Sequence, residues 1–157
     1  MSHTVLFVCT ANVCRSPMAE ALFNAQAQRI GENDHYVARS AGTWALNNQP
    51  ASGNSIVAMT KRGIDLHKHR ARTVTREMID DAAVVLVMTR NHAEALKAEF
   101  PAHRPKIHLV SELTERMYDI ADPYGSSIDD YETCARELET LIETGYPKIK
   151  AWISQGN

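Results

Sequence analysis

Short apolar runs alternate with helical patterns along the chain. Residues 4–8, TVLFV, form a continuous run of β-forming residues, which is typical of a strand buried on both faces. The segments YVARSAG (36–42), AAVVLVM (82–88) and KIHLV (106–110) predict three further strands. This alternation of strand and helix favours a parallel sheet with helices on both faces.

The segments between and after these runs predict helices. A helix is expected from Ser16, because serine is a good N-cap and Pro17 suits the first helical position. Two more helices are predicted over 52–63 and 90–100, and a last long helix begins near Ser127. The apolar positions of this last helix recur every three or four residues: Ile128, Tyr131, Ala135, Leu138 and Ile142.

Length and composition suit one globular domain over residues 1–157. Apolar residues make up 44% and charged residues 23%, and the net charge of −2 comes without a long basic run. This argues against nucleic acid or an anionic membrane as a main partner. The start of the sequence lacks the pattern of a signal peptide, and three cysteines are too few for a disulfide scaffold. We therefore expect a cytoplasmic protein.

The segment CTANVCRS (9–16) carries the strongest chemical signal. It follows the first predicted strand, and ligands of parallel sheets bind beyond the carboxyl ends of the strands. The backbone N–H groups of Thr10 to Arg15 can form an anion-sized concavity at a helix N-terminus, where Arg15 adds a fork for two phosphate oxygens. Cys9 would lie at its floor, with its thiolate stabilised and Ser16 donating a hydroxyl. The pattern favours a nucleophile under a bound phosphoryl group.

The residues alone leave other interpretations open. A cysteine at the end of a buried strand is often just a small apolar residue, and a Cys-x5-Arg pattern recurs by chance. A Walker-type nucleotide loop is excluded because its glycines and its Lys-Ser/Thr pair are missing. A metal site at Cys9 and Cys14 is poorly supported, because no further His or Cys pair has suitable spacing.

The longer segment VCTANVCRSPMAE resembles the phosphate loop of the low-molecular-weight protein tyrosine phosphatases, whose pattern is Val-Cys-x-Gly-Asn-x-Cys-Arg-Ser-Pro. The resemblance extends in order to SAGTW (40–44), HKHRART (67–73), VLVMTRNH (85–92) and DPYGSSIDDYE (122–132). It implies a four-stranded parallel sheet in the order 2-1-3-4, with the phosphate loop between strand 1 and helix 1. It also implies hydrolysis of phosphomonoesters through a phosphocysteine, without metal or other cofactor. The expected partners are phosphorylated proteins or peptides, with phosphate or another oxyanion in the loop.

The resemblance gives residues of this loop a role. Cys9 corresponds to the nucleophile, Arg15 to the phosphate clamp and Ser16 to the hydroxyl partner of the thiolate. Asn12 corresponds to a residue in a left-handed turn, and Ser40 and His69 correspond to groups that brace the loop. The other phosphate-binding positions are Thr10, Ala11, Val13 and Cys14.

One loop residue departs from the family pattern. Ala11 stands where the family usually has glycine. If that position requires a positive φ, alanine costs on the order of 1 kcal/mol. We expect strain or a small shift there, with activity retained.

Cleavage of a phosphate ester also needs a proton for the leaving oxygen. Asp122 lies before Pro123 in the segment 111–126, which we expect to be a loop, and spacing alone favours it only modestly. The resemblance to the Asp-Pro-Tyr loop of the family identifies Asp122 as the general acid. The candidate carboxylates are Asp80, Asp81, Asp122, Asp129 and Asp130.

The sequence leaves two candidate substrates, phosphotyrosine and phosphoarginine. Trp44 and Tyr124 either wall a cleft for an aryl phosphate or are partly buried packing residues. At the position of Val13 the tyrosine-phosphatase branch typically has a larger aliphatic residue, whereas the bacterial protein-arginine-phosphatase branch has threonine. The segments DPYGSSIDDYE and VMTRNH lean toward that second branch. Phosphotyrosine is the main prediction and phosphoarginine the alternative.

The remaining cysteines bear on two rival functions. Cys14 either forms a disulfide with Cys9 on oxidation or packs beneath the loop, and Cys134 is expected in the core. Thioredoxin-coupled arsenate reductase shares the fold, but it uses further cysteines after the middle of the chain, where this sequence has only Cys134. A non-catalytic phosphate-binding module would be expected to lack the nucleophile or the acid, and both are present.

Overall fold

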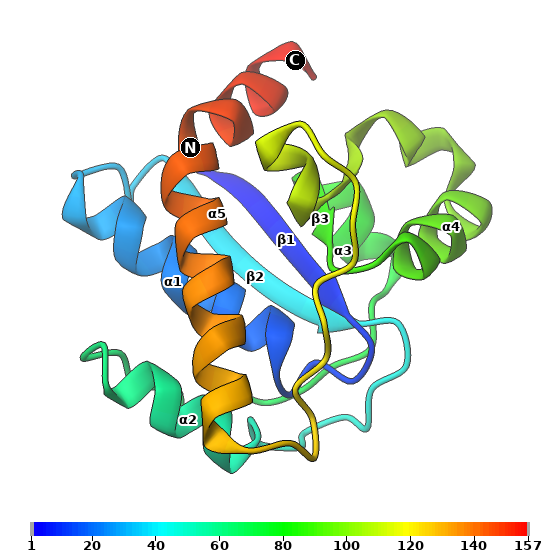
Figure 1. Ribbon diagram of the computed structural model, residues 1–157. Coiled ribbons are helices and arrows are strands. Elements are labelled where there is room, and N and C mark those ends of the chain that lie inside the picture. Colours follow the sequence, from blue (N-terminus) through cyan, green and yellow to red (C-terminus); the bar gives the residue numbers. More distant parts are fainter. Residues whose placement is uncertain (1, 157) are drawn as a thin grey trace.

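The computed structural model describes residues 2–156 and is built on one sheet (Figure 1). Four parallel strands lie in the order β2-β1-β3-β4, which confirms the predicted topology. Because β1 is central, its carboxyl end lies between the ends of β2 and β3, where the following loops converge. The strands are β1 (His3–Cys9), β2 (Tyr36–Gly42), β3 (Ala82–Val87) and β4 (Ile107–Leu109).

Helices cover both faces of the sheet. The long α5 lies against α1 and α2 on one side, while α3 and α4 lie on the other (Figure 1). No helix among residues 2–156 is long and apolar enough to cross a membrane. The helices are α1 (Arg15–Arg29), α2 (Gly53–Thr60), α3 (Arg76–Asp81), α4 (Arg90–Glu99) and α5 (Ile128–Gln155), and the 3-10 helices are η1 (Pro101–Lys106) and η2 (Val110–Thr114).

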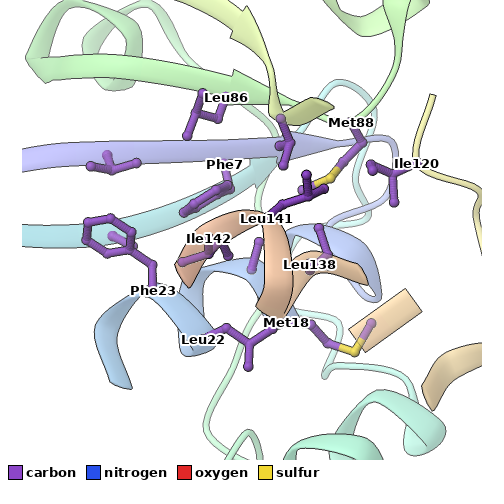
Figure 2. Packing of buried hydrophobic residues seen from close by; sticks show 14 of the residues in the cluster. Phe7, Met18, Leu22, Phe23, Leu86, Met88, Ile120, Leu138, Leu141 and Ile142 are labelled. Atoms are coloured by element: carbon purple, nitrogen blue, oxygen red, sulfur yellow. The ribbon is translucent and has the colours of Figure 1, made fainter. Parts of the chain in front are cut away.

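The central strand β1 supplies side chains to two hydrophobic clusters. Successive strand residues point to opposite faces, so Val5 and Phe7 join the cluster with α1 and α5, and Leu6 joins the cluster with α3 and α4. Figure 2 shows Phe7 near Ile142 of α5 and Phe23 of α1. Because β1 is buried on both sides, the residue at its carboxyl end is held in place by the whole core.

Three predicted details are wrong. Helix α1 begins at Arg15 with Cys14 as its N-cap, so Ser16 is not the cap and Pro17 is not the first residue. Helix α3 was not predicted because its six residues are too few to show a helical period, although Thr75 accepts a hydrogen bond from the Met78 N–H and caps it. The expected loop over 111–126 begins with most of η2.

Candidate active site

The backbone of the segment 9–14 turns its carbonyl groups outward. Each of five carbonyl oxygens accepts a hydrogen bond from a group outside the segment. Because the C=O and N–H of one peptide unit point in opposite directions, this arrangement turns the amide groups toward the inside of the loop. Within residues 2–156, no N–H of residues 10–14 donates to a backbone carbonyl. The bonds are Thr43 N to Cys9 O (2.9 Å), Trp44 N to Thr10 O (3.0 Å), His69 Nε2 to Asn12 O (2.7 Å), Ser52 N to Val13 O (2.9 Å) and Met18 N to Cys14 O (3.2 Å).

Positive charge borders the same loop. The Arg15 side chain is only 4% exposed, and its Nη1 donates to the Ile120 carbonyl at 2.8 Å. Its Nη2 lies 3.6 Å from Oδ2 of Asp122, and its Nε is buried without a hydrogen-bond partner among the described residues. Among residues 2–156, no side chain caps the N-terminus of α1. Buried donors and an uncapped helix N-terminus together favour an anion at this place.

Cys9, the last residue of β1, places its sulfur beside Ser16. Cys9 is buried, and its Sγ is 2.9 Å from the Ser16 hydroxyl oxygen. That oxygen accepts a hydrogen bond from Asn12 Nδ2 at 2.8 Å. Its own proton has two acceptors within reach, the Cys9 sulfur at 2.9 Å and, at the longer distance of 3.4 Å, the Ala41 carbonyl oxygen. A hydroxyl that donates to sulfur stabilises the thiolate over the thiol.

Asn12 fixes this network. Its Oδ1 accepts the Arg72 N–H at 3.0 Å, which leaves Nδ2 to donate to Ser16 and, at 3.0 Å, to Ser40. Ser40 in turn donates to the Glu20 carboxylate at 2.7 Å. The φ of Asn12 is 60°, the left-handed conformation that was expected.

The strain expected at Ala11 from a positive φ is absent, and the small shift given as its alternative stays a prediction. The non-glycine residues with positive φ in the described chain are Asn12, Asn48 and Glu115, so Ala11 adopts a conformation that alanine tolerates. The left-handed turn of the loop is made by the asparagine alone.

A close contact beneath the loop was not predicted. A Cβ atom on Gly42, the last residue of β2, would lie 2.4 Å from the Thr10 carbonyl oxygen and 3.1 Å from the Asn12 nitrogen. Only glycine therefore lets the loop pass over the end of β2. The available signal was the glycine of SAGTW, the segment that also contains Ser40. A second missed residue is His92, which lies within VLVMTRNH and contacts Thr10.

A cleft of about 610 Å³ opens above the sulfur. Trp44 and Tyr124 line it with 72% and 68% of their surface exposed, so neither is a buried packing residue. Asp122 also lines the cleft, and its side chain is 48% exposed. Cys9, Arg15, Asp122, Trp44 and Tyr124 are thus brought to one place.

The other two cysteines have different surroundings. Cys14 is buried under the loop, with its Sγ 3.4 Å from Ser52 Oγ and 3.4 Å from the Tyr131 hydroxyl, and burial raises the pKa of its thiol. Cys134 is buried in the cluster with α1 and α5, as expected, and burial raises its pKa to about 12. Both thiols are therefore protonated and poorly reactive near neutral pH.

This geometry suits one kind of chemistry. A concave ring of amides and a buried guanidinium can hold a tetrahedral oxyanion, while a sulfur lies below it and a carboxylic group lies at the rim. Such a site binds a phosphoryl group between a nucleophile and a proton donor.

Comparisons with known proteins agree with this geometry. The model of the family described as low molecular weight phosphotyrosine protein phosphatase matches residues 4–151. The chain is 40% identical to a protein-arginine-phosphatase of Bacillus subtilis, with 93% of this chain and 96% of the relative covered. It is 30% identical to a probable low molecular weight protein-tyrosine-phosphatase, EpsP, of Ralstonia nicotianae, with 96% and 99% covered.

A solved structure adds to these relatives. It is that of the YwlE arginine phosphatase, a cysteine-to-serine mutant with a phosphorylated active-site serine. Its TM-score to this chain is 0.89 at 37% identity, with 94% of this chain and 95% of that chain covered. Family model, relatives and fold agree, and the chain therefore belongs to the low molecular weight protein tyrosine phosphatase family of phosphoprotein hydrolases.

Proposed function

We propose that this phosphatase hydrolyses phosphotyrosine in proteins through a phosphocysteine on Cys9. The observation that carries the proposal is the bonding of the loop carbonyls from outside, which leaves the amide groups facing the space above the sulfur. Arg15 binds two of the phosphoryl oxygens, and its Nε, which has no partner among the described residues, supplies one of the donors. Asn12, Ser40 and His69 hold the loop in shape.

In the first step the Cys9 thiolate attacks phosphorus in line with the leaving tyrosine oxygen. The sulfur–phosphorus bond forms as the phosphorus–oxygen bond breaks. The carboxylic acid of Asp122 gives its proton to the leaving oxygen, so tyrosine departs as the neutral phenol. The thiolate charge is stabilised before attack by the Ser16 hydroxyl at 2.9 Å.

In the second step water hydrolyses the phosphocysteine. The Asp122 carboxylate takes one proton from the water as its oxygen attacks phosphorus. The phosphorus–sulfur bond breaks, inorganic phosphate leaves, and the thiolate of Cys9 and the acid form of Asp122 are restored. The amides and Arg15 hold the same three oxygens throughout.

The walls of the cleft favour an aryl leaving group. Trp44, Leu46 and Tyr124 present exposed apolar surface beside Val13, and an aromatic ring fits between such walls. The side chain of Val13 has no polar atom for a more polar leaving group.

A second candidate substrate is phosphoarginine. Relatives 40% and 37% identical over nearly the whole chain are named protein-arginine-phosphatases. The phosphorylated serine in the YwlE mutant structure supports a covalent step in either case. Only the leaving group differs between the two candidates. The same phosphate-binding loop (residues 9–15, here called the cradle) and the same nucleophile therefore serve both.

We also infer a cytoplasmic location, with no role for nucleic acid or membrane. All three cysteines lack a disulfide, and a catalyst that depends on a thiol requires a reducing compartment.

The test compares hydrolysis of one peptide sequence carrying either phosphotyrosine or phosphoarginine. Wild type is expected to have the higher kcat/KM for phosphotyrosine. Val13→Thr should shift the ratio toward phosphoarginine, and Val13→Ile should leave it in favour of phosphotyrosine. A wild-type preference for phosphoarginine would replace the main proposal by the second. No turnover of either peptide or of p-nitrophenyl phosphate would contradict both proposed activities and favour a non-catalytic phosphate-binding module.

A further inference from the structure

His92 connects the cradle to a helix on the other side of the sheet. It lies in the first turn of α4 and is buried, and its Nε2 is 2.8 Å from Oγ1 of Thr10. Thr10 directly follows Cys9, whereas His92 is 82 residues away in the sequence. This bond is therefore a tertiary contact made beside the proposed nucleophile, and the mechanism above does not use it.

The backbone determines which ring nitrogen of His92 carries the proton. The Thr89 N–H donates to Nδ1 at 3.2 Å, so Nδ1 must present its lone pair. The proton of a neutral ring is then on Nε2, and it is donated to Thr10 Oγ1. Thr89 Oγ1 completes the capping box by accepting the His92 N–H at 3.2 Å.

The surroundings keep this ring neutral. Burial, followed by the charge of Arg15, lowers the pKa of His92 to about 4, against smaller opposing effects of Asp119 and Asp122. A protonated ring would also place a second N–H against the Thr89 N–H. Near neutral pH the Nε2–H tautomer and its bond to Thr10 therefore persist.

The bond leaves the hydroxyl proton of Thr10 without an acceptor. Oγ1 receives the proton of His92, and within residues 2–156 it has no other hydrogen-bond partner. Thr10 lines both the cleft of about 610 Å³ and a second cleft of about 550 Å³. The two clefts share Thr10, Arg15 and Asp122, so this free donor lies where the phosphate clamp and the acid meet.

We propose that His92 is a positioning residue that holds the Thr10 hydroxyl as a hydrogen-bond donor to an oxygen of the bound phosphoryl group. The inference rests on the phosphate cradle proposed above. A hydroxyl that already accepts a hydrogen bond is the stronger donor, and a donor bound to an anionic oxygen contributes more than one bound to a neutral group. No proton is transferred; His92 only fixes the direction in which the hydroxyl points.

The test is a double-mutant cycle read out as inhibition by vanadate, with p-nitrophenyl phosphate as substrate. Thr10→Val removes the hydroxyl and keeps the branched shape, and His92→Ala removes the group that aims it. Each change should weaken vanadate inhibition roughly tenfold, the equivalent of one hydrogen bond to a charged group. The double variant should be no weaker than either single variant, because both changes remove one and the same bond.

Two conservative variants sharpen the cycle. His92→Gln keeps an acceptor for the Thr89 N–H and a donor for Thr10, and should restore vanadate affinity to within roughly threefold of wild type. Thr10→Ser keeps the hydroxyl and should do the same. Urea unfolding of every variant separates loss of the helix cap from loss of the donor, and if His92→Ala does not fold, Thr10→Val and His92→Gln decide.

Three results would overturn the proposal: wild-type vanadate affinity in Thr10→Val, losses that multiply to roughly a hundredfold in the double variant, or failure of His92→Gln to restore affinity. Multiplying losses would mean that His92 acts on the loop independently of the hydroxyl. An inactive wild type would instead be a failure of the proposed function.

Discussion

The loop after β1 and the loop before α5 border the same cleft but are held in opposite ways. In the first, Asn12 and Ser16 are buried, and the carbonyls are bonded from three other parts of the chain and from α1 itself. In the second, Asp122 and Tyr124 are about half and two-thirds exposed. The contacts of the Asp122 carboxylate are Arg15 at 3.6 Å and the Tyr124 N–H at 3.1 Å.

This difference matches the role that we propose for each loop. Donors that stabilise a developing charge are most effective when they are already oriented, because no reorganisation is then needed during the reaction. A general acid that must reach leaving groups of different sizes benefits from a side chain that few contacts restrain. Changes in the first loop should therefore affect stability and activity together, whereas changes in the second should affect the rate alone.

The largest loss of activity is expected from changes at Cys9 and Arg15, the proposed nucleophile and the proposed phosphate-binding arginine. Cys9→Ser and Arg15→Ala should each lower the kcat for p-nitrophenyl phosphate by at least roughly a thousandfold, because nucleophile and clamp act as one unit. Steady-state kinetics measure this, with circular dichroism as the control for folding. Turnover within tenfold of wild type in either variant would contradict the assignment.

Replacement of Asp122, the proposed acid, should lower the rate without weakening anion binding. Asp122→Asn should lower kcat for phosphotyrosine by about 10²–10⁴-fold, as expected for loss of a general acid. Vanadate affinity should change by less than roughly threefold, and the free energy of unfolding by less than about 0.5 kcal/mol, because an exposed ion pair contributes little. Equal losses in rate and in vanadate affinity would assign Asp122 to the cradle instead.

Substitution of Gly42 tests whether a single change beneath the cradle lowers both the stability and the activity of the protein. In Gly42→Ala the added Cβ would lie 2.4 Å from the Thr10 carbonyl oxygen, so the loop must shift. We expect a loss of about 1–3 kcal/mol in the free energy of unfolding and a roughly tenfold or greater loss in kcat/KM. Gly53→Ala is the matched control, because a Cβ there has no neighbour within 4 Å and should leave both values near wild type. Normal activity in Gly42→Ala would show that the loop tolerates displacement.

The smallest effect concerns stability at acid pH. The pKa of His92 is about 4, below the ordinary value of 6.5, so the unfolded chain binds this proton more readily than the folded protein does. The contribution of His92 to stability is therefore present above about pH 6.5 and lost as the pH falls toward 4. The free energy of unfolding should fall less steeply over this range in His92→Gln than in wild type. Identical slopes would contradict the burial of a neutral ring.

How much the sequence predicts differs between these features. The strand over 36–42 is confirmed residue for residue, because a continuous β-forming run between turn residues has few alternatives. Helix α3 was not predicted because a short polar segment shows no helical period of apolar residues. Its Thr75 cap is recognisable only once the helix is known. The strand order followed from the family resemblance, since hydrophobic pattern alone does not fix which strands are neighbours.

The site was predictable where its residues are consecutive. Cys9 to Ser16 lie in one segment. The acceptor of Arg15, in contrast, is the backbone carbonyl of Ile120, and no pattern of side chains predicts a backbone acceptor. Gly42 and His92 act through close backbone approach and one tertiary hydrogen bond, and such contacts appear only after folding. The absence of strain at Ala11 likewise depended on a backbone angle that a motif does not report.

The most direct measurement is to find where the phosphoryl group resides during turnover. Wild type should be mixed with an excess of phosphotyrosine peptide, quenched within milliseconds and analysed by mass spectrometry of its peptides, with Cys9→Ser as the control. We expect a phosphate on the Cys9 sulfur that appears as tyrosine is released and decays as inorganic phosphate forms. Turnover without any phosphorylated Cys9, or with the phosphate on another residue, would contradict it.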